Sequence, residues 1–319
     1  MCDTQYRFAE RERRNADVLI AQALAEDLGQ IGDMTSTAVI PSHARGAARL
    51  VARSPGVLAG MSAVERLVAE FELIDNWEPH LTDGSSLEPG SLIARVHGPM
   101  RSLLAMERIA LNFLQRLSGI ATLTARFVAA VADTRAAIYD TRKTTPGWRA
   151  LEKYAVRCGG GHNHRFGLFD AILIKDNHLA WLQAAAQPAG PDLFAAVIGA
   201  ARANSPVGTT IEIEVDSLEQ LDRALVHGPD IILVDNLGPD VMAEAVRRRD
   251  KLAPSIQLEA SGGVNLATVR ALALSGVDRI SVGALTHSAP ALDLALDFES
   301  GLVSPGLAVA VDDSEGVHS

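Results

Sequence analysis

The chain has 319 residues, of which 48% are hydrophobic and 21% charged, and its formal net charge at pH 7 is -10. This composition supplies enough apolar material for one large or two ordinary packed domains, and it excludes global disorder. The isoelectric point near 5.4 argues against non-specific nucleic-acid binding.

The cysteine content and the hydropathy pattern indicate in which cellular compartment the protein is expected. Cys2 and Cys158 are the only cysteines, which makes a disulfide framework improbable and favours a reducing compartment. No apolar run approaches the ~20 residues of a membrane span. The highly charged segment 1–19 has no signal-peptide core. We therefore expect a cytoplasmic protein that binds neither nucleic acid nor a membrane.

The first hundred residues predict an α+β unit. Residues 1–17 are polar and are expected to form a flexible tail. Apolar residues at helical spacing predict a helix over 16–28, with Gly29 as its C-cap, followed by a turn-rich stretch at 32–36. Further on, short apolar runs predict strands at 48–53, 56–60 and 90–98, and amphipathic spacing predicts a helix at 62–71. We assign residues 18–116 to an α/β sandwich domain.

The segment from Met100 to Ala132 predicts a helix with one interruption at Ser118-Gly119. Its apolar stripe includes Leu103, Phe113 and Leu117. Arg108 lies off this stripe, and spacing alone favours a solvated helix charge at that position.

After residue 135, short apolar runs alternate with helical segments, which predicts a parallel sheet. The expected strands are 136–139, 171–174, 211–215, 230–234, 256–258 and 279–282. The expected helices are 150–157, 193–204, 218–227, 239–252 and 266–275. One unit repeated in this way favours a short α/β barrel over residues 117–298, with a C-terminal tail at 299–319.

Polar residues follow the strands at their carboxyl ends. These residues are Asp140 to Lys143, Lys175, Glu214, Asp235, Ser261 to Gly263, and Gly283. In an α/β barrel such positions converge on the catalytic face.

Cations are concentrated between residues 140 and 178. There the basic residues Arg142, Lys143, Arg149, Lys153, Arg157, Arg165 and Lys175 outnumber the acidic residues Asp140, Glu152, Asp170 and Asp176. A solvated basic loop is the simpler explanation of such a cluster. However, these charges follow strand-like runs, and the triple glycine at 159–161 allows close approach to a ligand. We therefore favour a site for a small polyanion, because Arg binds carboxylate or phosphate in bidentate fashion and Lys supplies a point charge.

The motifs of this region resemble those of the quinolinate phosphoribosyltransferase family. The segments that carry the resemblance are TRKTTPG, EKYAV, GGGHNHR and LIKDNH, with MERIALNFLQRLSGIAT before them and IEIEVDS, LVDN, LEASGGVN and ISVGALTHS after them. The resemblance covers residues 18–298. It implies an incomplete or seven-stranded α/β barrel after an α/β sandwich, and transfer of phosphoribose from phosphoribosyl pyrophosphate (PRPP) to quinolinate with decarboxylation.

The resemblance also implies roles for particular residues. The matching arginines Arg108, Arg142 and Arg165 would bind the dicarboxylate together with His164, while Lys143 and Lys175 would lie near the phosphoribosyl group, with Thr141 in the same substrate set. Arg108 would reach the active site of the neighbouring subunit, which implies a homodimer with shared active sites. By itself, a histidine beside a glycine run is more often structural.

Two carboxylates and two glycine turns complete the predicted site. Glu214 and Asp235 end successive strands, so they could hold Mg²⁺ through water or stabilise positive charge on the ribose. Glu212 lies one layer deeper on the same strand face and is expected to be structural. The turn Ser261-Gly262-Gly263, expected to open a helix capped by Asn265, would form a phosphate site with Gly283-Ala284. We assign catalytic roles to Lys143, Lys175, Glu214 and Asp235.

Two other readings remain open on the residues. A Schiff-base aldolase would use Lys175 as its amine, but it leaves Arg142, Arg165 and the GGGHNHR segment unexplained. A non-catalytic paralogue of the kind found in molybdate operons would bind an oxyanion, but the motif residues that catalysis requires are all present.

Overall fold

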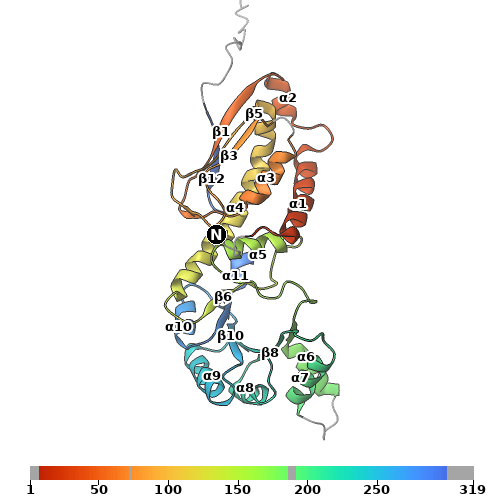
Figure 1. The fold of residues 1–319 in the computed structure, drawn as a ribbon, viewed down its shortest axis with the longest axis vertical. Helices are drawn as coiled ribbons and strands as arrows, with labels where there is room; N and C mark the ends of the chain where they lie inside the picture. Colours follow the sequence, from red (N-terminus) through yellow and green to blue (C-terminus); the bar gives the residue numbers. More distant parts are fainter. Residues whose placement is uncertain (1–6, 72–73, 186–191, 300–319) are drawn as a thin grey trace, which may run out of the picture.

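The computed structural model describes residues 7–71, 74–185 and 192–299. Two parts are stacked along the long axis of the molecule, and one long helix runs between them (Figure 1). Among the described residues, none of the helices combines the length and apolar character needed to span a bilayer. The predicted tail at 299–319 lies outside the described residues, except for Glu299.

The first part is built on a four-stranded antiparallel sheet in the order β12-β1-β5-β3. Its strands are β1 (Arg45–Ala52), β3 (Asn76–Pro79), β5 (Leu92–Pro99) and β12 (Leu294–Phe298), and a separate pair is formed by β2 (Gly56–Val57) and β4 (Ser86–Leu87). The helices of this part are α1 (Glu10–Leu28), α2 (Met34–Val39), α3 (Met61–Ala69) and the first half of α4 (Met100–Val131). Helix α4 packs on β1, β5 and β12, and α1 and α3 pack against α4. This arrangement is the expected α/β sandwich.

The amino-terminal region is more ordered than the sequence predicted. Helix α1 begins at Glu10, so most of the described part of the expected tail is helical. The Ala9 N–H donates to Glu12 Oε2 over 3.1 Å, and Glu12 also binds Arg157 of the second part at 3.1 Å. A carboxylate in the first turn is favourable at a helix N-terminus. The expected turn at 32–36 is also wrong in part, because Asp33 accepts the Ser36 N–H and caps α2.

Helix α4 is continuous, so the predicted interruption at Ser118-Gly119 is wrong. Both residues are used for tertiary contacts. Ser118 Oγ accepts the Ala59 N–H over 3.0 Å and donates to the Ala59 carbonyl over 3.2 Å. Gly119 allows the Pro290 carbonyl to lie against the helix, where a Cβ would come within 2.1 Å of it. Packing therefore overrides the low helix propensity of the pair.

The second part is an open α/β barrel of six parallel strands, ordered β6-β11-β10-β9-β8-β7. The strands are β6 (Ala137–Tyr139), β7 (Ile172–Ile174), β8 (Ile211–Val215), β9 (Ile231–Asp235), β10 (Gln257–Ser261) and β11 (Arg279–Ser281). All six expected strands are present. The cyclic order is broken between β6 and β7, where His162 makes an isolated parallel bridge to Tyr139. The fold class is thus confirmed as a short, incomplete barrel after a sandwich.

Helices follow the strands of the barrel. They are α5 (Arg149–Cys158), α6 (Asp176–Ala185), α7 (Leu193–Ala203), α8 (Leu218–Leu225), α9 (Pro239–Leu252), α10 (Val269–Leu274) and α11 (Ala284–His287). The sequence pattern does not predict α6, α11 or β12, nor the short strands β3 and β4 of the first part. Strand β12 returns to the first sheet, where Phe298 pairs with Ala48. Residues 294–298, assigned by sequence to the barrel domain, therefore form an edge of the sandwich sheet, and α4 also crosses the predicted boundary at 116/117.

Alanine substitutions at two helical glycines should change the stability of the protein in opposite directions. Gly199→Ala in α7 meets nothing within 4 Å, so it should stabilise the protein by about 0.8–1 kcal/mol through helix propensity. Gly119→Ala collides with the Pro290 carbonyl and should destabilise it by about 1–3 kcal/mol. Urea unfolding of both variants measures this. Stabilisation by Gly119→Ala would contradict the close approach of α4 to residue 290.

Candidate active site

A cavity of about 770 Å³ lies at the carboxyl ends of the parallel strands. Every predicted site residue except Arg108 lines it: Thr141, Arg142, Lys143, His164, Arg165, Lys175, Glu214, Asp235, Ser261, Gly262, Gly263, Gly283 and Ala284. Their convergence on one face follows from the parallel topology, because the polar residues follow the strand ends. The roles assigned to them remain predictions.

Arg108 is the exception. It lies on α4 in the first part, its side chain is exposed, and it does not line the cavity. In a single chain Arg108 is therefore solvated, which is the position that its spacing on the helix favours.

Two arginines and two lysines line the cavity, and their charges are only partly neutralised by protein groups. Arg142 Nε is buried without a hydrogen-bond partner among the described residues. Arg165 donates to the Ala171 carbonyl over 3.1 Å, and burial followed by the nearby Arg142 charge lowers its pKa. Lys175 Nζ lies 2.8 Å from Glu214 Oε2. Two arginines that repel each other in a partly buried cavity favour a bound anion.

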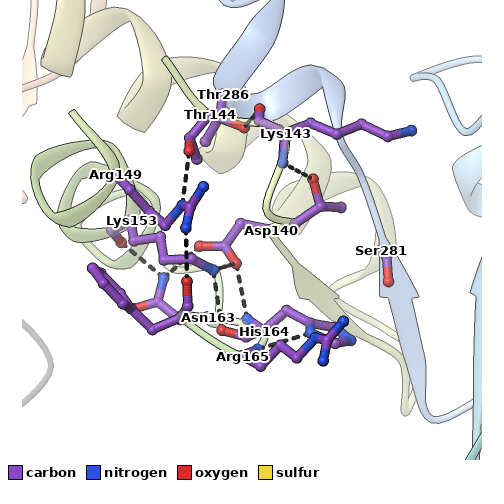
Figure 2. Close-up of polar contacts among 12 residues, drawn as sticks. Asp140, Lys143, Thr144, Arg149, Lys153, Asn163, His164, Arg165, Ser281 and Thr286 are labelled. Carbon is purple, nitrogen blue, oxygen red and sulfur yellow. Dashed lines mark hydrogen bonds and ion pairs between the residues drawn. The ribbon is translucent and has the colours of Figure 1, made fainter. Parts of the chain in front are cut away.

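The loops that carry Arg142, Lys143 and Arg165 are anchored by a buried acid–base pair, Asp140 and Lys153 (Figure 2). Lys153, 2% exposed, forms an ion pair with Asp140, which is fully buried at the end of β6. Asp140 also accepts the His164 N–H over 2.8 Å and Asn163 Nδ2 over 2.7 Å. Lys153 donates to the His164 carbonyl over 3.0 Å. This network fixes the backbone of the GGGHNHR segment beside β6.

Burial disfavours charge on both partners of this pair. It raises the pKa of Asp140 and lowers that of Lys153, and each partner's charge opposes the shift of the other. Removing either one would leave an uncompensated charge in the protein interior, which is strongly destabilising.

His164 faces carboxylates more than open cavity. Its Nε2 lies 2.9 Å from Glu212 Oε2 and 3.5 Å from Glu259 Oε1, and its side chain is 9% exposed. Burial lowers the pKa of His164, but hydrogen bonds to Glu212 and Glu259 outweigh burial and raise it to about 9. The Arg165 N–H, which donates to Nδ1 over 2.8 Å, opposes protonation. The two carboxylates outweigh this single dipole, because charge interactions are strong in a buried site.

Glu212 is buried below Glu214 on β8, as expected for a structural residue. Glu259, Ser281 and His287 also line the cavity, although the sequence pattern does not single them out. Glu259 was missed because the predicted strand ended at Leu258, whereas β10 continues to Ser261. His287 was missed because α11 was not predicted, although it belongs to the quoted motif ISVGALTHS.

Two groups of side chains could hold a cation. Glu214 and Asp235 line the cavity from β8 and β9, and carboxylate oxygens are the ligands that Mg²⁺ prefers. His164, Glu212 and Glu259 bring their ligand atoms within 4.8 Å of one another. In this second group, however, Arg279 Nε already lies 2.7 Å from Glu259 Oε2, and the histidine lies between the carboxylates. The predicted pair Glu214 and Asp235 therefore fits Mg²⁺ better.

The glycine turn after β10 differs from the prediction. It does not open a helix, because α10 begins only at Val269. Asn265 instead caps a turn, accepting the N–H groups of Ala267 and Thr268 over 2.9 and 3.2 Å. Gly262 has φ +91°, and a Cβ there would come within 2.8 Å of the Asn236 nitrogen. A phosphate site here would rest on the backbone of this turn rather than on a helix N-terminus.

Two family models together match most of the chain. The model described as quinolinate phosphoribosyl transferase, N-terminal domain, matches residues 33–118, and the model of the C-terminal domain matches residues 120–297.

Similar proteins cover nearly the whole chain. A Bacillus subtilis protein named probable nicotinate-nucleotide pyrophosphorylase [carboxylating] is 44% identical over 88% of this chain and 92% of its own length. A Mycobacterium leprae protein named nicotinate-nucleotide pyrophosphorylase [carboxylating] is also 44% identical, over 87% of this chain and 95% of its own. The crystal structure of NadC from Streptococcus pyogenes superposes with a TM-score of 0.81 at 38% identity, covering 90% of this chain and 97% of that one.

The environment of His164 predicts a pH dependence of stability. Its pKa of about 9 in the folded protein lies above the ordinary value of 6.5. The imidazolium therefore contributes stability that is complete below pH 6.5 and is lost as the pH rises through 9, by about 3 kcal/mol at most.

Urea unfolding of wild type and Glu212→Gln between pH 6 and 10 tests this. The variant should lose less stability over that range, because one of the two carboxylates is gone. Glu219→Gln, which removes an exposed carboxylate from α8, should behave as wild type. Identical slopes for wild type and Glu212→Gln would show that the Arg165 N–H keeps His164 neutral.

Proposed function

The chain belongs to the quinolinate phosphoribosyltransferase family, and from this membership we propose the reaction that it catalyses. It transfers the phosphoribosyl group of PRPP to quinolinate with decarboxylation, giving nicotinate mononucleotide, pyrophosphate and CO2, a step of NAD biosynthesis. The observation that carries the proposal is the cavity in which Arg142, Lys143, Arg165 and Lys175 meet in a protein of net charge -10.

The charges of the substrates match these groups. Quinolinate has two carboxylates, and PRPP has a 5′-phosphate and a pyrophosphate. Burial of so much negative charge is prohibitive without cations. Arg142 and Arg165, whose charges repel each other, would bind the dicarboxylate with their planar donor groups. Lys143 and Lys175 would lie beside the phosphoribosyl group, and the Ser261–Gly263 turn with Gly283 and Ala284 would bind phosphate.

The reaction needs no nucleophile from the protein. The pyridine nitrogen bonds to the ribose C1 as the C1–oxygen bond to pyrophosphate breaks. The bond from C2 of the ring to its carboxylate then breaks, CO2 leaves, and a proton takes its place. Glu214 and Asp235 would stabilise positive charge on the ribose in the first step. Cys158 has no part, because it is buried and burial raises the pKa of its thiol.

Mg²⁺ is proposed as the metal ion of this site. Glu214 and Asp235 would hold it, in part through water, and it would neutralise pyrophosphate oxygens. Mg²⁺ sites commonly combine one or two carboxylates with substrate phosphates. The ion pair of Glu214 with Lys175 leaves Asp235 as the carboxylate without a hydrogen bond or ion pair among the described residues.

A Schiff-base aldolase is not favoured. Lys175 is ion-paired with Glu214, and its side chain is 47% exposed. A Schiff-base lysine is activated by an apolar pocket or by a neighbouring cation. The non-catalytic paralogue is not favoured either, because the relatives matched over most of the chain are named as enzymes.

The functional form is proposed to be a cytoplasmic homodimer with shared active sites. Arg108 lies on α4, away from the cavity of its own chain. A two-fold dimer would place it over the partner's barrel and would use the same surface twice.

The reaction is tested by measuring pyrophosphate and CO2 release from PRPP with quinolinate, with nicotinate as the control acid. Quinolinate should be the strongly preferred substrate, because the cationic groups of the cavity exceed what a monocarboxylate requires. CO2 and pyrophosphate should appear in equal amounts. Equal turnover of the two acids would refute the proposed specificity, and no turnover of either would refute the function.

The shared site is tested by complementation. Arg108→Ala and Lys175→Ala subunits, each inactive alone, are mixed and allowed to exchange. A mixed dimer holds one site with both residues intact and one with neither, so activity should return toward a quarter of wild type on random reassociation. Absence of activity after confirmed exchange would contradict the shared-site dimer.

A further inference from the structure

Arg116, in the middle of α4, makes contacts that the proposed reaction does not explain. Its guanidinium contacts Glu152 of α5, with Nη2 2.7 Å and Nε 3.3 Å from Oε1. Nη2 also donates to the Thr286 carbonyl, and Nη1 donates to the Ala289 carbonyl over 3.3 Å. The Arg116 side chain is 28% exposed and that of Glu152 is fully buried. Neither residue lines the cavity.

Glu152 continues this chain of contacts to the loop that carries Lys143. The Thr145 N–H donates to Glu152 Oε2 over 3.1 Å, and Thr145 Oγ1 donates to Oε1 over 2.8 Å. The hydrogen bonds that the Glu152 carboxylate accepts therefore come from Arg116 and from Thr145, which lies in the 141–147 loop. A buried carboxylate with several donors holds them in fixed geometry.

A second connection reaches the same loop through α11. Thr286, which is fully buried, donates its hydroxyl to the Lys143 carbonyl over 2.8 Å (Figure 2). Arg116 holds the Thr286 carbonyl. The backbone around Lys143 is thus connected to α4 through Glu152 and Thr145, through a direct contact of Arg116 Nη2 with Thr145 Oγ1 at 3.4 Å, and through Thr286.

We propose that Arg116 and Glu152 are positioning residues, which hold the loop so that Lys143 projects into the cavity toward the phosphoribosyl substrate. This inference rests on the proposed function, and it adds residues outside the cavity to the machinery of that site. Lys143 Nζ makes no hydrogen bond or ion pair among the described residues, and its side chain is exposed. Its position therefore depends on its backbone, which the Arg116–Glu152 pair fixes.

If Arg116 and Glu152 are positioning residues, their effect on substrate binding acts through Lys143. Affinity for PRPP, measured by titration calorimetry, should fall on the order of 10-fold in Glu152→Gln and in Arg116→Met, because a displaced Lys143 would lose a charge-assisted hydrogen bond to a substrate phosphate. Arg116→Lys should be intermediate, because a single ammonium cannot reach Glu152 and two carbonyls together. Arg126→Met is the matched control, since Arg126 lies on the same helix, is exposed and makes no contact of this kind within the described residues.

The same substitutions in a Lys143→Ala background complete the test. Without Lys143, Glu152→Gln should change PRPP affinity by less than about 2-fold, because coupled residues are not additive. An equal loss in both backgrounds would overturn the proposal and leave the pair a structural role only. Thr145→Val removes one hydroxyl, which donates to Glu152 Oε1 over 2.8 Å and accepts from Arg116 Nη2 over 3.4 Å. It leaves the ion pair itself in place, so it provides a mild variant if Glu152→Gln does not fold.

The wild type separates this proposal from the proposed function. If wild type does not convert quinolinate and PRPP, the function is wrong. If wild type does and the double-variant effects are additive, the function stands and the positioning role does not.

Discussion

The constraint on which the site depends is the cost of gathering positive charge in a partly buried cavity. Arg142 and Arg165 lie close enough for the charge of one to lower the pKa of the other. Such groups can be kept together without their ligand only if the backbone that carries them is anchored elsewhere. The buried Asp140–Lys153 pair and the contact of the buried Glu152 with the partly exposed Arg116 connect these loops to the rest of the protein. Buried ion pairs are weak sources of net stability, and here their geometry matters more than their energy.

The anchors also connect the first part of the molecule to the site in the barrel. Helix α4 packs on the sandwich sheet and extends along the barrel, so Arg116 connects the helix between the parts to the loop after β6. Glu12 of α1 reaches Arg157 of α5 in the same way. Side chains of the first part and of the connecting helix therefore stabilise the mouth of the barrel from outside. Preorganisation of this kind lowers the cost of binding a highly charged substrate.

The sequence predicted the barrel and the cavity well because both depend on local pattern. Six apolar runs became six strands, and the polar residues after them converged because parallel strands end on one face. It failed where tertiary contacts decide. Ser118 and Gly119 continue α4 because Ala59 and the Pro290 carbonyl pack on them. Strand β12 lies nearly 250 residues from its partner β1, a pairing that no local pattern encodes. The resemblance implies that His164 binds the substrate, but only the fold shows that it lies between Glu212 and Glu259.

A crystal structure with quinolinate alone would test the central claim most directly. The account predicts the pyridine ring in the cavity at the strand ends, with its carboxylates paired to Arg142 and Arg165. The backbone from Asp140 to Thr145 should keep its place, with the Asp140–Lys153 and Glu152–Arg116 contacts intact. Quinolinate bound elsewhere, or a loop that must rearrange to bind it, would contradict a site preorganised by these two ion pairs.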